Sequence, residues 1–146
     1  MDIINLIKQK FGDCCQLCSP LNKNQYDEAK TILPDELLEI LKISNGINEL
    51  MIHPNSNSGK PFVIDSIVYS FDEIKSETRN FFNLYCEKGT VFAGNGAGGY
   101  FVINPDGKIY LYEYLDEGGE YYADNLLSYF DRFWFASTNI NGGHIW

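Results

Sequence analysis

The apolar residues near the start of the chain recur at helical spacing. From Asp2 to Phe11 they fall on one face of a helix, and Gly12 is a suitable stop. Residues 25–31 predict a second, short helix. Residues 13–24 show no period, so we expect them to be irregular.

Residues 33–46 give the most complete helix signal in the chain. Leu33 precedes Pro34, which suits the first helical position because its missing N–H costs nothing there. Acidic residues fill the first turn, where they oppose the positive end of the helix dipole. Asn45 and Gly46 then favour a left-handed stop. The segment predicts a helix with a buried stripe of leucine and isoleucine.

Strand and helix patterns alternate from residue 50 to residue 86. Residues 50–53 predict a short strand, and a polar loop separates it from a β-branched strand over residues 62–69. Ser70 and Glu73 form a capping-box pattern that opens a helix running to about Cys86. The residues expected to be buried on this helix are Ile74, Phe81, Phe82 and Tyr85.

Three more strands follow, joined by tight turns. They are predicted over residues 90–93, 99–104 and 108–115, with Gly107 in the second turn. Residues 117–120 predict a loop. Asp124 is expected to cap a last helix from Asn125 to about Phe135. The residues expected to be buried there are Leu126, Leu127, Phe130 and Phe133 or Trp134.

Helices therefore flank a central run of antiparallel strands. The sequence predicts an α+β fold, a mainly antiparallel β-sheet flanked by α-helices, in a single domain over residues 1–146.

The glycine-rich sequence before residue 100 fits two different interpretations, a nucleotide-binding motif and a β-turn. Gly94, Gly96 and Gly99 match a dinucleotide-binding motif, which requires a helix directly after the last glycine. Residues 100–103 are aromatic and β-branched and instead predict a strand. We favour a tight β-turn. Binding of a small ligand or nucleotide through Gly94–Gly99 is the weaker alternative.

Composition narrows the class of protein. The 146 residues fit one domain, and an apolar fraction of 45% argues against a disordered chain. The N-terminus lacks the pattern of a signal peptide, and no apolar run approaches the roughly 18 residues of a membrane span. We expect a cytoplasmic protein without membrane contact.

The charge is acidic and unevenly distributed. The net charge is −9, and the window from Asp106 to Asp131 carries −6 of it, with Lys108 as its single base. Such a surface repels a nucleic-acid backbone and suits a basic protein partner. Plain solubility is the alternative explanation of the acidic residues.

The sequence shows no pattern of catalytic or metal-binding residues. In the cluster Cys14, Cys15 and Cys18, the last two have CxxC spacing, but a zinc site needs a second ligand pair, and His53 and His144 are isolated. All four cysteines are expected to be reduced structural thiols. We therefore expect no enzyme activity, no cofactor and no metal.

With these elements placed, the chain resembles the SUKH superfamily, which includes bacterial immunity proteins and fungal cell-wall assembly regulators. One segment that carries the resemblance is Leu33-Pro34, the helix after it, and Asn45-Gly46. The other is the glycine run Gly94, Gly96 and Gly99, followed by an aromatic strand, Gly107 and a further strand. The resemblance spans residues 25–135.

This resemblance implies a non-enzymatic, protein-binding role. Bacterial members of the family are immunity proteins that neutralise a toxin, often a nuclease, by direct contact. The resemblance thus implies a cognate toxin with a basic domain as the partner. A scaffold or regulatory module without a toxin is the alternative.

The acidic, tyrosine-rich stretch is the expected contact face. The predicted contact residues are Tyr112, Glu113, Tyr114, Asp116, Glu117, Glu120, Tyr121, Tyr122 and Asp124. Acids would pair with lysine or arginine of the partner, and tyrosines would supply apolar area. Strand alternation places Tyr110, Tyr112 and Tyr114 on one face, so some of these rings fit the core equally well.

Overall fold

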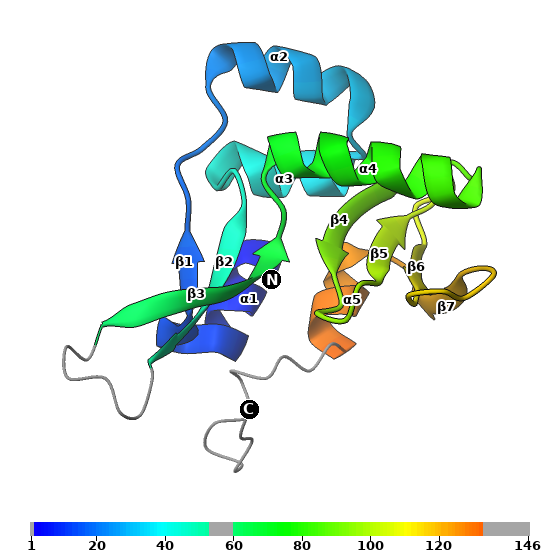
Figure 1. Cartoon of the computed structure of the whole chain (residues 1–146). Coiled ribbons are helices and arrows are strands. Elements are labelled where there is room, and N and C mark those ends of the chain that lie inside the picture. The colour runs from blue at the N-terminus through cyan, green and yellow to red at the C-terminus, as the bar shows by residue number, and fades with distance from the viewer. Residues whose placement is uncertain (1, 53–59, 133–146) are drawn as a thin grey trace.

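The computed structural model describes residues 2–52 and 60–132 and combines helices with two β-sheets (Figure 1). The helices are α1 (Ile3–Phe11), α2 (Lys23–Ile32), α3 (Asp35–Ile43), α4 (Phe71–Tyr85) and α5 (Leu126–Arg132), with a 3₁₀ turn η1 (Gly12–Cys14). The strands are β1 (Cys15–Leu17), β2 (Ile47–Ile52), β3 (Pro61–Val68), β4 (Thr90–Gly94), β5 (Tyr100–Ile103), β6 (Ile109–Tyr112) and β7 (Glu120–Ala123).

The predicted α+β fold is confirmed, with two antiparallel sheets where the sequence indicated one. The first sheet has the order β1-β2-β3 and the second β4-β5-β6-β7. The two sheets meet where the Tyr69 N–H donates to the Phe92 carbonyl at 2.8 Å, just after β3. Figure 1 shows them side by side, with α4 running above β4 and β5.

Helices cover both faces of the four-stranded sheet. On one face Phe101, Ile103 and Ile109 join the main core, together with buried residues of α1, α3 and α5. On the other face Val102 packs with Phe81 of α4 in a smaller cluster. This split follows from the period of two in a strand, which sends neighbouring side chains to opposite faces.

The start of α4 follows the predicted capping box. The Ser70 hydroxyl accepts the Glu73 N–H at 3.3 Å, and the Ser70 N–H donates to the Glu73 carboxylate at 3.1 Å. The helix runs from Phe71 to Tyr85, as expected. Of the side chains predicted to be buried, Phe82 is 51% exposed, because neighbouring helical residues point about 100° apart and Phe81 takes the position that faces the sheet.

Asn45 and Gly46 do not form the predicted stop of α3 but contact the start of α4. That helix already stops at Ile43, and Gly46 has φ +98° within the chain entry to β2. The Asn45 side-chain oxygen accepts the Phe71 N–H at 2.7 Å. A Cβ at Gly46 would lie only 3.1 Å from the Ser70 nitrogen. The pair therefore holds the start of α4 against the loop after α3.

Other element boundaries differ from the prediction. Pro34 is the N-cap of α3, one residue before the expected position. Residues 15–17 form β1, which the sequence did not indicate, because only pairing with β2 makes this short segment a strand. β2 begins at Ile47, earlier than expected. The predicted strand 108–115 ends at Tyr112, and β7 was not foreseen.

The last helix is capped one residue later than predicted. The Asn125 side chain accepts the Ser128 N–H at 2.8 Å, whereas Asp124 bonds to Tyr121. Leu127 was expected to be buried, but its side chain is 40% exposed. The predictions for His53, His144, Phe133, Trp134 and Phe135 fall outside the described residues.

Candidate protein-binding surface

The predicted contact residues form the outer end of the four-stranded sheet. We define the acidic surface as residues 113–124, which comprise the loop after β6, strand β7 and Asp124. Leu111 pairs with Glu120, so the loop leaves and re-enters the sheet at neighbouring positions. Figure 1 shows this loop projecting beyond the strands, away from the three-stranded sheet.

The loop opens with a tight turn that displays a leucine. The Asp116 N–H donates to the Glu113 carbonyl at 3.0 Å. Between them Leu115 has φ +70° and is 80% exposed. A branched side chain in the left-handed region costs about 1–2 kcal/mol, and an exposed leucine gains nothing from burial. Neither the left-handed backbone nor the exposed side chain of Leu115 stabilises the folded protein on its own.

Tyr112 anchors the loop from below and is not available as a contact residue. It is 8% exposed, and its ring packs edge-on against Phe81 with centroids 4.7 Å apart. Burial, and then its hydrogen bond to Glu87, raise the pKa of Tyr112. A Cβ at Gly119 would meet this ring at 2.5 Å. The loop thus closes directly over Tyr112. Of the two positions considered for this ring, contact face or core, the structure shows the core.

The other tyrosines differ in exposure. Tyr114 is 64% exposed, and its ring lies against Gly98, where a Cβ would be 3.3 Å from Tyr114 Cγ. Tyr121 is 49% exposed, and its hydroxyl donates to the Asp124 carboxylate, which is the main reason that the pKa of Tyr121 is raised. Tyr122 is half-buried, with its ring centroid 5.2 Å from that of Phe101. Tyr114 and Tyr121 are therefore the rings that a partner can reach.

The carboxylates of the loop are exposed and take part in no described ion pair. Glu113, Asp116, Glu117 and Glu120 are exposed, and none forms an ion pair with any residue in the described ranges. Burial, and then the negative charges of Asp116 and Glu87, raise the pKa of Tyr85, whose hydroxyl donates to the Glu113 carbonyl at 3.3 Å. Glu87, which the sequence did not indicate, therefore extends the acidic surface toward α4.

The glycine segment beside this surface bends one strand back onto the next, as predicted, through a loop over residues 95–99. It connects β4 to β5, and a strand begins at Tyr100 where a dinucleotide site would need a helix. The Asn95 side-chain oxygen accepts the N–H groups of Ala97 at 2.9 Å and Gly99 at 2.8 Å. Gly96 and Gly98 have positive φ. Two of the amides that could bind a phosphate are thus occupied by Asn95.

The cysteine cluster does not form a metal site in the part of the chain that the structure describes. No group of three histidine, cysteine, aspartate or glutamate side chains there is arranged to hold a metal ion. Burial is the main cause that raises the pKa of both Cys14 and Cys15, which favours the protonated thiol over the thiolate. Among the described helices, none combines the length and apolar character of a membrane span.

Comparison with protein-family models, with curated proteins and with solved structures finds no match to this chain. The predicted relation to the SUKH superfamily therefore stays a prediction.

Proposed function

We propose that this protein binds another protein through its acidic surface, as an immunity protein that neutralises a basic toxin domain by direct contact. The observation that carries the proposal is the combination of free carboxylates with exposed apolar side chains on one loop. Leu115 and Tyr114 are 80% and 64% exposed beside Asp116 and Glu117.

Solubility alone accounts poorly for this combination. Solvation favours charged residues at a loop tip, and exposed leucine and tyrosine work against it. Interfaces, by contrast, use aromatic and apolar anchors within a ring of polar groups. The left-handed Leu115 strengthens the argument, because strained residues at exposed positions concentrate at functional sites.

The chemistry of the surface defines the partner. Four exposed carboxylates favour a cluster of lysine and arginine, as on a nuclease that binds a phosphate backbone. Complementary charges raise the association rate, and this gain falls as salt is added. Leu115 and Tyr114 would then insert into an apolar depression between the basic side chains. No step of this role requires catalysis.

The direct test is charge reversal on the acidic surface. A triple variant, Asp116→Lys, Glu117→Lys and Glu120→Lys, should lose affinity by about 100-fold or more, because each close charge pair is worth about 1.5 kcal/mol or more. The partner is obtained by cross-linking and capture from the native cell, and affinity is then measured on purified proteins at low salt.

A second triple variant controls for net charge. Asp13→Lys, Asp27→Lys and Glu39→Lys change the same total charge at exposed sites away from the loop. This control should leave the affinity within about 3-fold, since distant exposed charges are screened. Equal affinities of the two folded triple variants for the partner would refute the proposal.

A further inference from the structure

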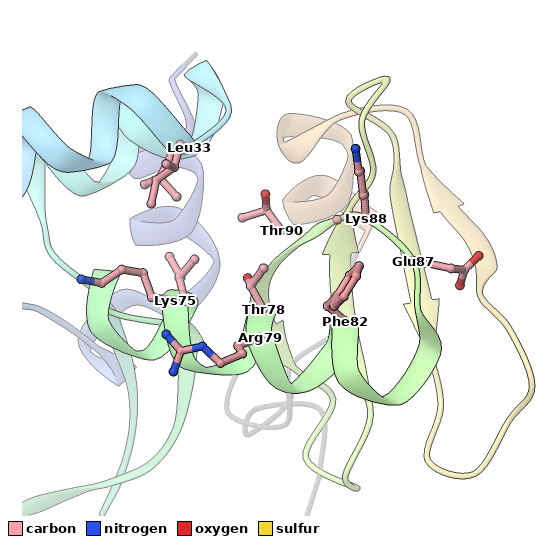
Figure 2. A pocket seen from close by; sticks show the side chains of 11 residues that line it. Leu33, Lys75, Thr78, Arg79, Phe82, Glu87, Lys88 and Thr90 are labelled. Carbon is pink, nitrogen blue, oxygen red and sulfur yellow. The ribbon is translucent and has the colours of Figure 1, made fainter.

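A pocket of about 460 Å³ lies beside α4 and reaches Glu87 at the edge of the acidic surface. It is lined by the end of α2 with Leu33, by one side of α4, and by residues 87–90 (Figure 2). A neighbouring hollow of about 390 Å³ shares Lys88 and Thr90 with it and continues to Pro105 and Gly107. We call the two together the groove. Its size lies within the roughly 300–1,000 Å³ typical of small-molecule sites.

The floor of the groove is apolar although it faces solvent. Ile32 is 52% exposed and Phe82 51% exposed, and the buried Leu33 and Ile74 lie beneath them. Thr78 spans the floor, its hydroxyl accepting the Val91 N–H at 3.0 Å. An alkyl or aryl group that covered Ile32 and Phe82 would remove apolar surface from water.

The rim of the groove is basic on a chain with a net charge of −9. Lys75 is already engaged, with Glu28 at 3.2 Å and Asp72 at 3.6 Å. Arg79 and Lys88, in contrast, make no ion pair within residues 2–52 and 60–132. Figure 2 shows Arg79 on α4 and Lys88 beside Thr90, on opposite sides of the pocket.

The one acid of the pocket does not neutralise these cations. Glu87 bonds to the Tyr112 hydroxyl at the edge of the acidic surface. In Figure 2 its carboxylate points away from Lys88 and from the pocket. An anion in the groove would therefore pair with Arg79 on one side or with Lys88 on the other, at the rim of an apolar floor.

We propose that the groove binds a small amphipathic carboxylate, an elongated apolar chain that ends in one anionic group. The chain lies over Ile32 and Phe82, and the carboxylate pairs with Lys88 or Arg79 at the rim. The apolar floor with cations only at its rim fits an apolar chain that carries a single anionic end. Binding of this ligand requires no partner on the acidic surface.

The test is a titration of the full chain with sodium octanoate, followed by ¹H–¹⁵N NMR. We expect saturable shifts at the amides of Thr78, Gly89 and Thr90, with a Kd of about 1 mM, as ligand-efficiency limits allow for ten heavy atoms. Octan-1-ol, which lacks the charge, should bind about 5-fold more weakly, and octylammonium should not bind with saturation.

Variants locate the two parts of the ligand. Arg79→Gln with Lys88→Gln should weaken octanoate binding about 5-fold and so bring it to the level of octan-1-ol. Phe82→Ser should weaken both ligands by a similar factor. The matched controls are Lys8→Gln and Leu84→Ala, because Lys8 is exposed on α1 and Leu84 is 63% exposed on α4, and neither lines the groove.

Each result decides the proposal. Saturable shifts that depend on Arg79 or Lys88 and on Phe82, with both controls unchanged, support it. Absence of shifts at about 20 mM octanoate, far above the expected Kd, would overturn it. So would equal binding of octan-1-ol, or a folded Arg79→Gln/Lys88→Gln protein that binds octanoate as the wild type does. Either of these would show that the basic rim recognises no carboxylate.

Discussion

The acidic surface and the groove are opposite in shape and in charge. The acidic surface is a projecting loop built from the consecutive residues 113–124, with free carboxylates around exposed Leu115. The groove is a depression assembled from four separate segments, with Arg79 and Lys88 around exposed Phe82. Both depend on α4, which contributes Phe81 to the cluster beneath the loop and Phe82 to the groove. Neighbouring residues of one helix thus support two opposite chemistries.

The largest effect is expected where the two regions share support. Phe81 is fully buried and contacts Tyr112, Tyr85 and Tyr100. Phe81→Ala should lower the free energy of unfolding by about 3–5 kcal/mol, the range for a buried phenylalanine. It should also weaken binding at both regions. Denaturant unfolding measures the first effect.

Phe82→Ala is the control, since this side chain is half-exposed. It should cost about 1 kcal/mol or less and affect only the groove. Equal losses of stability in the two variants would contradict the packing described for α4.

A smaller change should disturb the acidic surface alone. At Gly119 a Cβ would meet the Tyr112 ring at 2.5 Å, whereas at Gly118 nothing lies within 4 Å. Gly119→Ala should therefore cost about 1–3 kcal/mol through overpacking. Gly118→Ala should be near neutral. Thermal and denaturant unfolding of the two variants compares them, and octanoate binding should stay unchanged in both.

Alkaline pH tests the anchor of the loop. The pKa of Tyr112 in the folded protein is raised above its ordinary value of 10.0, mainly by burial. The stability that the buried neutral ring contributes is thus fully present below pH 10 and is lost as pH rises through the folded pKa. Above pH 10 the unfolding free energy of the wild type should fall faster than that of Tyr112→Phe, by at most about 1.4 kcal/mol per pH unit. Parallel pH curves for the two proteins would show that Tyr112 titrates as in the unfolded chain.

The smallest effect is expected at Leu115, where one substitution should raise stability and lower partner affinity. Leu115→Gly removes the strain of φ +70° and should raise the unfolding free energy by up to about 1 kcal/mol. It also removes the exposed leucine, so partner affinity should fall while stability rises. A variant that is more stable and binds the partner as before would show that Leu115 has no part in recognition.

Local signals in the sequence predicted the elements that depend on neighbouring residues. The capping box of Ser70 and Glu73 and the stop at Gly12 are complete within a few positions, and both are present. The glycine turn was also predictable, because the residues after Gly99 are strand formers. By contrast, Asn45 binds Phe71, which is 26 residues away, so its role is invisible in a local pattern.

For the candidate sites, too, the sequence predicted what neighbouring residues determine and missed what depends on distant contacts. The acidic surface is contiguous, and the sequence located it, but it could not separate Tyr112 in the core from Tyr114 in solvent. Their difference depends on where β6 ends and on Phe81 from α4. The groove brings together Ile32, Phe82 and Lys88, whose separations in the chain carry no period. Only the packing of α2 beside α4 reveals it.

Strand β7 has a consequence for self-association. Among the described strands it is the terminal one in the order β4-β5-β6-β7, and backbone groups at such a border can template pairing between molecules. Here the border strand is only four residues long and begins with Glu120, with Asp124 just beyond it. Two copies meeting border to border would bring these carboxylates together. The same charges that are proposed to attract a basic partner would thus keep the protein from polymerising through its own sheet.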